Sequence, residues 1–270
     1  MMTGVSVVTT SAPAVDPAAG DAGLPFQLLN WLDGAIFLDF DGTLVDLAET
    51  PEGVLVVPGL IDALAVLQRH CGGRLAIVSG RPIAQIDAML APLHLPVAGV
   101  HGNERRDAAG LLHYSPTPSL TAVLKRAEAL AAAHPLLRVE QKRGALALHY
   151  RQAPHLEAVC KQAMTAALQE SPGIMLLFGK MVIEAKPAGV NKGTAITDFL
   201  AEAPFAGHVP LFAGDDTTDE AGFDAVQRAG GCGLKVGAGP TGARLRVAGP
   251  QALREQLLQL AALLSKGTAR

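Results

Sequence analysis

The chain has 270 residues, 49% of them hydrophobic and 17% charged, so it can bury the core of one large domain or of two modest ones. Its net charge of -3 excludes the strongly basic surface that binds nucleic acid or an anionic membrane, so a phosphate-bearing ligand must be bound by local groups. The three widely separated cysteines exclude a disulfide framework and a cysteine metal site, and they predict reduced, buried thiols.

Residues 1–24 are rich in Ala, Gly, Thr and Pro, and they lack the basic start and continuous apolar core of a signal peptide. We expect this segment to be disordered. No apolar run in the sequence approaches the length of a membrane span. We therefore expect a cytoplasmic protein that binds a small molecule and has neither nucleic acid nor a membrane as a partner. A monomer is the default expectation, because nothing in the sequence gives the oligomeric state.

Two carboxylates stand at the end of the first predicted strand. The apolar run from Ala35 to Leu38 is typical of a strand buried on both faces, as in a parallel sheet. A strand that simply ends in a turn would explain Asp41, which precedes a glycine, but not Asp39, which is followed by Phe40. Buried carboxylates are rare unless they are paired or bind a metal. The segment therefore predicts a metal-assisted catalytic site.

Helical patterns alternate with the predicted strands. Leucines repeat at helical spacing over residues 60–67, a proline suited to a first helical turn opens residues 82–90, and a third helix is predicted over residues 191–200. A leucine-rich amphipathic helix, residues 253–264, follows near the end. Strands that alternate with helices predict an α/β fold with a doubly wound parallel sheet.

Two further strands end in polar residues as the first one does. Residues 75–78 lead into Ser79, and residues 210–214 lead into Asp215. Ligands of doubly wound sheets gather outside the carboxyl ends of the strands. This arrangement would bring Asp39, Ser79 and Asp215 together, although the sequence separates them.

The middle of the chain has a different pattern. Helical patterns flank strand-like runs at residues 137–151 and 174–185. Helices segregated from antiparallel strands predict a small α+β module inserted into the first domain. We place this module at residues 112–187, and the α/β core at residues 25–111 and 188–270.

The carboxylates at the strand ends suit a hard divalent cation. Mg²⁺ prefers oxygen ligands and typically takes one or two carboxylates together with substrate phosphate, so Asp39 and Asp215 are the candidate ligands. Asp216 and Asp219 could support these ligands by hydrogen bonds. For Asp219 and Glu220, capping of a helix and compensation of its dipole is an equally good interpretation.

Asp39 is also a candidate nucleophile, because a carboxylate can form an aspartyl phosphate. Two like charges ~4 Å apart cost about 4 kcal/mol at an effective dielectric of about 20, so attack on a phosphate needs nearby positive charge. Mg²⁺ could supply it, together with Lys192 at the start of a predicted helix. Ser79 and the backbone N–H of Gly80 could hold a phosphate oxygen. Asp41 could protonate the leaving alcohol and then deprotonate the hydrolytic water.

Four segments together resemble the signature of the haloacid dehalogenase (HAD) superfamily of phosphatases. They are Asp39-Phe40-Asp41-Gly42-Thr43, Val78-Ser79-Gly80-Arg81-Pro82, Lys192 and Gly214-Asp215-Asp216-Thr217-Thr218-Asp219. The resemblance implies a Rossmann-like core, with Asp39 as nucleophile and Asp41 as acid/base. It also implies magnesium held by the carboxylates of Asp39 and Asp215 and by the carbonyl oxygen of Asp41.

Further segments are similar to the trehalose-6-phosphate phosphatase family and occur in the same order. They are Gly99 to Arg106, Glu140 to Gly144, Leu148 to Arg151, Glu184 to Pro187 and Asn191 to Gly193. The resemblance implies a free-standing bacterial phosphatase that hydrolyses trehalose 6-phosphate, the last step of trehalose biosynthesis. It also implies that the inserted module is a cap that closes over the sugar.

The same resemblance implies that Glu140, Lys142 and Glu184 hold the sugar hydroxyls. From the residues alone, these side chains would belong to the solvated face of an antiparallel sheet. We expect His101 and the adjacent Gly102 near the substrate; the alternative for His101 is a hydrogen-bonded structural histidine.

Three other functions remain open. The first is a phosphatase of the same superfamily that acts on another sugar phosphate, such as sucrose phosphate. The second is a phosphomutase, which would return the phosphoryl group to the sugar. The third is a non-catalytic sugar-phosphate sensor, against which stands the presence of Asp39, Asp41, Lys192 and Asp215 together.

Overall fold

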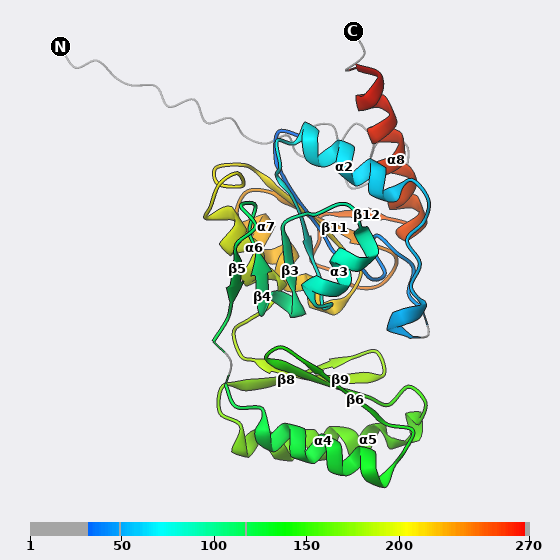
Figure 1. The fold of residues 1–270 in the computed structure, drawn as a ribbon, viewed down its shortest axis with the longest axis vertical. Coiled ribbons are helices and arrows are strands. Elements are labelled where there is room, and N and C mark those ends of the chain that lie inside the picture. Colours follow the sequence, from blue (N-terminus) through cyan, green and yellow to red (C-terminus); the bar gives the residue numbers. More distant parts are fainter. Residues whose placement is uncertain (1–31, 49, 117, 268–270) are drawn as a thin grey trace, which may run out of the picture.

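The computed structural model describes residues 32–48, 50–116 and 118–267 (Figure 1). Within these residues the strands form one eight-stranded and one four-stranded sheet. The disorder expected for residues 1–24 concerns a segment outside the described residues. None of the helices in the described part of the chain has the length and apolar character needed to span a bilayer.

The larger sheet has the strand order β12-β11-β10-β1-β2-β3-β4-β5 and is parallel from β12 to β3. Its parallel strands are β1 (Ala35–Leu38), β2 (Leu75–Val78), β3 (Val97–Gly99), β10 (Pro210–Gly214), β11 (Cys232–Val236) and β12 (Leu245–Val247). β4 (Glu104–Arg106) and β5 (Leu112–Tyr114) continue it in antiparallel pairing. The central strands β1, β2 and β10 are apolar throughout because they are buried on both faces.

Helices cover both faces of the larger sheet. They are α2 (Leu60–His70), α3 (Ile83–Leu90) and α8 (Pro250–Gly267) on one face, and α6 (Lys192–Leu200) and α7 (Glu220–Arg228) on the other. Along β1, Ile36 packs with the first set, and Phe37 packs with the second. Phe37 lies 5.9 Å from Phe199 of α6, ring centroid to ring centroid, which fixes α6 against the sheet. The doubly wound arrangement is therefore confirmed.

The smaller sheet is antiparallel, in the order β6-β7-β9-β8. Its strands are β6 (Arg138–Lys142), β7 (Ala145–His149), β8 (Ile174–Gly179) and β9 (Val182–Pro187). One face packs on α4 (Thr121–Ala133) and α5 (Glu157–Ala167) through a cluster that includes Val123, Leu146, Met164 and Ile183. Figure 1 shows these helices on the side away from the larger sheet, so the other face of the smaller sheet is turned toward it.

The predicted start of the inserted module falls on a strand of the larger sheet. We placed its start at residue 112, but Leu112–Tyr114 forms β5 and pairs with β4 as the edge of the larger sheet. The turn between these strands is fixed by Asp107, whose Oδ1 accepts hydrogen bonds from the backbone N–H groups of Ala109 and Leu111, each at 2.9 Å. All three residues of β5 are exposed, so no buried period marks the strand in the sequence.

Candidate active site

The carboxyl ends of three neighbouring strands meet at one cavity. β1 lies between β2 and β10, so Asp39, Ser79 and Asp215 follow adjacent strand ends. A cavity of about 760 Å³ lies between these ends and the open face of the smaller sheet, and residues of both layers line it. The three side chains expected to meet therefore line the same cavity.

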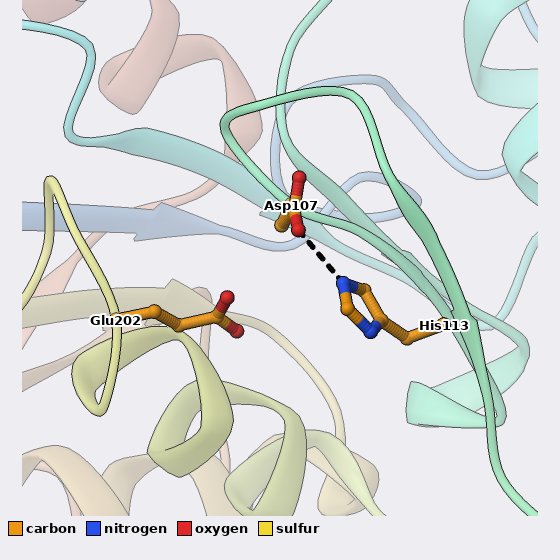
Figure 2. A group of neighbouring side chains, drawn as sticks. All are labelled: Asp107, His113 and Glu202. Atoms are coloured by element: carbon orange, nitrogen blue, oxygen red, sulfur yellow. Dashed lines mark hydrogen bonds and ion pairs between the residues drawn. The ribbon is translucent and has the colours of Figure 1, made fainter.

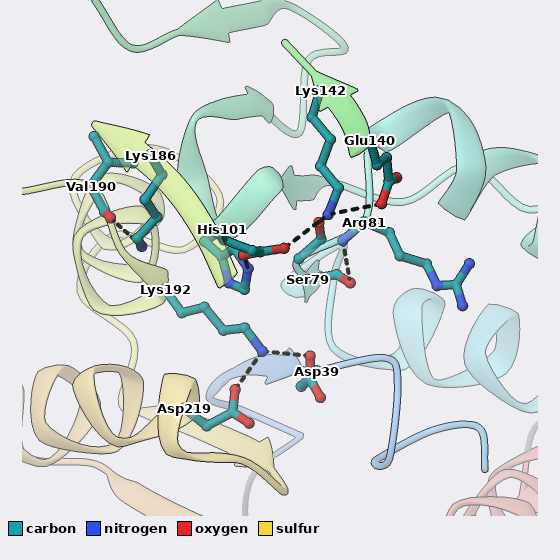
Figure 3. A network of polar contacts seen from close by, with 12 residues as sticks. Asp39, Ser79, Arg81, His101, Glu140, Lys142, Lys186, Val190, Lys192 and Asp219 are labelled. Carbon is teal, nitrogen blue, oxygen red and sulfur yellow. Dashed lines mark hydrogen bonds and ion pairs between the residues drawn. The ribbon is translucent and has the colours of Figure 1, made fainter. Parts of the chain in front are cut away.

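Lys192 links two of the carboxylates (Figure 3). Its Nζ donates to Asp39 Oδ1 and to Asp219 Oδ1, each at 2.7 Å, and all three side chains are buried. The side chain of Asn191 accepts a hydrogen bond from the N–H of Thr194 at 3.0 Å, and this cap starts α6 at Lys192. Burial alone would lower the pKa of Lys192, but the charges of Asp219 and Asp39 outweigh burial and raise it.

The carboxylates at this end of the cavity disfavour one another's ionisation. Burial raises the pKa of Asp39 well above its ordinary value, although Lys192 opposes the shift. Burial, reinforced by the charge of Asp219, raises the pKa of Asp215 to about 6. Oxygen atoms of Asp39, Asp215 and Asp219 lie within 4.8 Å of one another. These oxygen atoms are hard ligands whose negative charges repel one another, so the group fits a divalent cation such as Mg²⁺.

Asp219 is already engaged by the protein on both oxygens. Oδ1 accepts from Lys192, and Oδ2 accepts from the backbone N–H groups of Asp215 at 3.0 Å and Asp216 at 2.9 Å. Asp39 and Asp215 are therefore the carboxylates best suited to a cation. A Cβ atom on Gly42, whose φ is +81°, would come within 2.2 Å of Asp215 Oδ2, so a side chain there would displace this carboxylate.

Asp41 is paired with an arginine that follows β2. Nε of Arg81 donates to Asp41 Oδ2 at 2.7 Å, and Nη2 donates to Asp41 Oδ1 at 2.8 Å. Ser79 lies beside this pair, because its Oγ accepts a hydrogen bond from the backbone N–H of Arg81 at 3.1 Å (Figure 3). Asp41, Ser79, Gly80 and Arg81 all line the cavity next to Asp39.

The smaller sheet brings Glu140 and Lys142 of β6 and Glu184 of β9 to the opposite wall of the cavity. Lys142 Nζ donates to Glu184 Oε1 at 3.0 Å and reaches the carbonyl oxygen of Gly80 at 3.3 Å. His101 Nε2 donates to Glu184 Oε2 at 2.7 Å. The polar face of this sheet therefore lies against the larger sheet instead of facing open solvent.

These contacts hold the cap carboxylates in the ionised form. Burial alone would raise the pKa of Glu184, but the contacts with His101 and Lys142 keep it below its usual value. The pKa of Glu140 is lowered, mainly because His149 Nε2 donates a hydrogen bond to its Oε2 at 3.0 Å. Burial lowers the pKa of His101, although Glu184 opposes the shift.

Of the remaining predicted site residues, Asp216 and His101 line the cavity. The exposed side chain of Asp216 accepts from the N–H of Thr217 at 2.7 Å and caps the short helix η5 (Thr217–Asp219). Gly102 packs against the start of α6, where a Cβ atom would lie 3.0 Å from the carbonyl oxygen of Asn191. His101 precedes it in a left-handed backbone conformation, with φ 55°, and lines the cavity.

A second group of potential metal ligands lies away from this cavity. Figure 2 shows Asp107, His113 and Glu202, whose ligand atoms also lie within 4.8 Å of one another. Asp107 already accepts from two backbone N–H groups and from His113 Nε2, the latter at 2.7 Å. Glu202 is paired with Arg105. Because these partners already satisfy the carboxylates, the group is explained as support for the β4–β5 turn.

Arg81, His149 and Lys235 contact site residues, although none of them has a role in the sequence-based prediction. His149 lines the cavity and contacts Glu140. Lys235 Nζ donates to the backbone carbonyl oxygen of Asp215. A lysine inside the otherwise apolar strand β11 was a signal that could have identified Lys235, because buried lysines are rare unless paired.

Comparison with known proteins adds independent findings. The family model described as "Trehalose-phosphatase" matches residues 37–252. The chain is 42% identical over 217 residues to the trehalose-6-phosphate phosphatase of Escherichia coli (strain K12), which covers 80% of this chain and 82% of that one. It is 39% identical over 238 residues to a probable trehalose-phosphate phosphatase of Sinorhizobium fredii, covering 86% and 89% of the two chains.

Solved structures resemble the whole fold. A trehalose-6-phosphate phosphatase related protein matches with a TM-score of 0.66 and 28% identity, over 86% of this chain and 99% of that one. The C-terminal domain of the C. albicans trehalose-6-phosphate phosphatase matches with a TM-score of 0.78 and 23% identity, over 93% and 99% of the two chains. The second likeness concerns the fold alone.

Proposed function

Because this chain belongs to the trehalose-phosphatase family, we propose that it hydrolyses trehalose 6-phosphate to trehalose and inorganic phosphate. The observation that carries the proposal is the shared cavity. One wall presents the Asp39–Lys192 pair, and the other presents Glu140, Lys142 and Glu184, whose charged groups can hydrogen-bond sugar hydroxyls.

In the proposed reaction, an oxygen of the Asp39 carboxylate attacks phosphorus, and the bond from phosphorus to the sugar oxygen breaks. Asp41 gives a proton to the departing sugar oxygen. Asp41 then takes a proton from water as the water attacks the aspartyl phosphate, which releases phosphate and regenerates Asp39. Lys192 fixes the orientation of Asp39 through its 2.7 Å contact.

Phosphate would be held by Ser79, by the backbone N–H of Gly80 and by the positive charge of Lys192. Asp39 and Asp215, together with the carbonyl oxygen of Asp41, would hold Mg²⁺, and Asp219 would keep Lys192 and the backbone of Asp215 in place. When bound, the cation neutralises the phosphate and the crowded carboxylates, so that Asp39 can react as an anion.

The two layers would have different roles in the reaction. We propose that the larger sheet and its helices form the catalytic core, and that residues 115–187 form a cap that selects the sugar. The proposed sugar ligands Lys142 and Glu184 stand on the smaller sheet and contact Gly80 and His101 of the larger one. Opening of this interface would therefore admit substrate, and its closure would separate the site from bulk solvent.

Phosphate release from trehalose 6-phosphate, sucrose 6-phosphate and glucose 6-phosphate tests this function, measured with Mg²⁺ and again with excess EDTA. We expect Mg²⁺-dependent release that strongly favours trehalose 6-phosphate. Release from another ester instead would keep the catalytic core and refute the assignment of the sugar site. Absence of release from all three would refute the phosphatase and favour a phosphomutase or a sensor.

A further inference from the structure

Arg81 makes a two-point contact with the proposed acid/base. Its Nε and Nη2 donate to the two carboxylate oxygens of Asp41 at 2.7 and 2.8 Å. Arg81 is buried, and the side chain of Asp41 is 28% exposed toward the cavity. A guanidinium group that binds both oxygens fixes the position of a carboxylate and also the plane in which it lies.

The backbone of Arg81 is itself held from both sides. Its N–H donates to Ser79 Oγ at 3.1 Å, and its carbonyl oxygen accepts from the N–H of Val100 at 3.0 Å. Gly99 approaches so closely that a Cβ atom there would lie 2.9 Å from the same carbonyl oxygen. The guanidinium group therefore projects from a rigid support at the end of β2.

The turn of residues 79–81 also joins the other parts of the site. Lys142 of the smaller sheet donates to the carbonyl oxygen of Gly80 at 3.3 Å, and the N–H of His101 donates to the carbonyl oxygen of Ser79 at 2.9 Å. Three consecutive residues therefore include the proposed phosphate ligands Ser79 and Gly80, the contact with the smaller sheet, and Arg81, the partner of Asp41. Because Ser79 and Arg81 belong to the same turn, Arg81 would hold Asp41 at a fixed position relative to a phosphate bound at Ser79.

We propose that Arg81 is a positioning residue that holds the carboxyl group of Asp41 for proton transfer to the leaving oxygen and from the hydrolytic water. The proposal rests on the acid/base role of Asp41 in the proposed function. Each carboxylate oxygen has two lone pairs, so the contact with Arg81 leaves capacity on both oxygens for a proton or a substrate. Without Arg81 the carboxyl group would rotate among several orientations, few of them productive.

The test compares two leaving groups in the full-length protein, with Arg81→Ala and Arg81→Lys as variants. Trehalose 6-phosphate releases an alcohol that must be protonated, whereas p-nitrophenyl phosphate releases a phenolate that needs no proton. We expect Arg81→Ala to slow the first-turnover release of trehalose by ~10- to 100-fold, because misorientation of Asp41 loses part of the ~10²- to 10⁴-fold that general acid catalysis contributes. The first-turnover release of nitrophenolate should stay near the wild-type rate.

The second expected result is a burst of nitrophenolate release. Asp41 must also activate water, so Arg81→Ala should release nitrophenolate in a fast burst followed by a slow steady state. Arg81→Lys keeps the charge but loses the two-point contact, so it should show the same pattern with a smaller slowing. Inhibition by inorganic phosphate should be unchanged, because Arg81 is proposed to contact Asp41 and not the phosphate.

Arg106→Ala is the matched control. Arg106 forms the same two-point pair with Asp87, at 2.7 and 2.6 Å, outside the cavity. This variant should keep the wild-type ratio of the two first-turnover rates, which separates orientation of Asp41 from a general loss of stability.

Equal slowing of both first-turnover rates in Arg81→Lys, or unchanged rates in Arg81→Ala, would overturn the proposal. Weaker inhibition by phosphate would also overturn it, because that result assigns Arg81 to the phosphate. If the wild-type protein hydrolyses another sugar phosphate in place of trehalose 6-phosphate, the proposed substrate fails. The comparison of leaving groups then tests Arg81 on that ester.

Discussion

At the core end of the cavity, carboxylate oxygens of Asp39, Asp215 and Asp219 lie within 4.8 Å of one another, and the pKa values of Asp39 and Asp215 are raised. At the cap end, Glu140 and Glu184 each have a histidine or lysine partner, and their pKa values are lowered. Ionisation of the carboxylates at the core end therefore becomes favourable only when positive charge is added. At the cap end, the partners of the carboxylates already stabilise the ionised form. This difference suits the first to a cation and a phosphate, and the second to uncharged hydroxyl groups.

The largest expected effect is at the core end. Asp39→Asn removes the nucleophile and should abolish turnover and formation of the aspartyl phosphate, while the fold and some substrate binding remain. Acid-quenched trapping of labelled phosphate on the protein would check this result, and Asp224→Asn is the control because Asp224 lies outside the cavity and pairs with Arg228. Near-wild-type turnover of Asp39→Asn, with deamidation excluded by mass spectrometry, would show that Asp39 is not the nucleophile.

Parts of this site could be predicted from the sequence because they follow from strand topology. Asp39, Ser79 and Asp215 each follow a short apolar run, and parallel strands place such residues at one edge. The hydrogen bond between His101 and Glu184 could not be predicted, because it depends on how the smaller sheet docks on the larger one.

Other features of the structure are not marked in the sequence by a hydrophobic period or by a change in composition. β5 is short and exposed, so its pairing follows from the turn held by Asp107 and not from a buried pattern. The contact between Arg81 and Asp41 joins residues 40 positions apart on two different strand ends. For Asp219, capping of a helix and support of the site are not alternatives, because Oδ2 accepts from the N–H of Asp216 while Oδ1 accepts from Lys192.

The next effect concerns magnesium and pH. The pKa of Asp215 is about 6 in the folded protein without metal, against an ordinary value of 3.8, so folding binds a proton. This contribution to the free energy of unfolding is complete below the ordinary pKa and is lost as the pH rises through about 6. Magnesium must displace the same proton, so its affinity should fall as the pH is lowered below that value.

Thermal unfolding with and without Mg²⁺ would check this prediction. We expect the ion to raise the unfolding temperature more at neutral pH than at mildly acidic pH, because ligand binding stabilises the folded state in proportion to its affinity. Asp215→Asn should remove most of this difference. Equal stabilisation by the ion at both pH values in the wild-type protein would contradict the contrast between the two ends.

The smallest effect is at the cap end. His149→Ala removes the hydrogen bond to Glu140, and we expect KM for trehalose 6-phosphate to rise about three- to tenfold with little change in kcat. His149→Gln, which keeps an N–H donor, should recover part of the loss. His113→Ala removes a comparable contact with Asp107 outside the cavity and should leave KM unchanged. A fall in kcat without a change in KM would place His149 in the chemical step.

The proposed separation of sugar recognition from catalysis is tested most directly in Glu184→Ala. The quantity to measure is the ratio of kcat/KM for trehalose 6-phosphate to kcat/KM for p-nitrophenyl phosphate. Loss of a buried group that hydrogen-bonds a sugar hydroxyl should lower the first value by ~100-fold or more and the second by less than about threefold. That result would place sugar recognition at the cap end and chemistry at the core end. An equal loss on both substrates would show that Glu184 supports the whole site, and it would contradict the separation of the two ends.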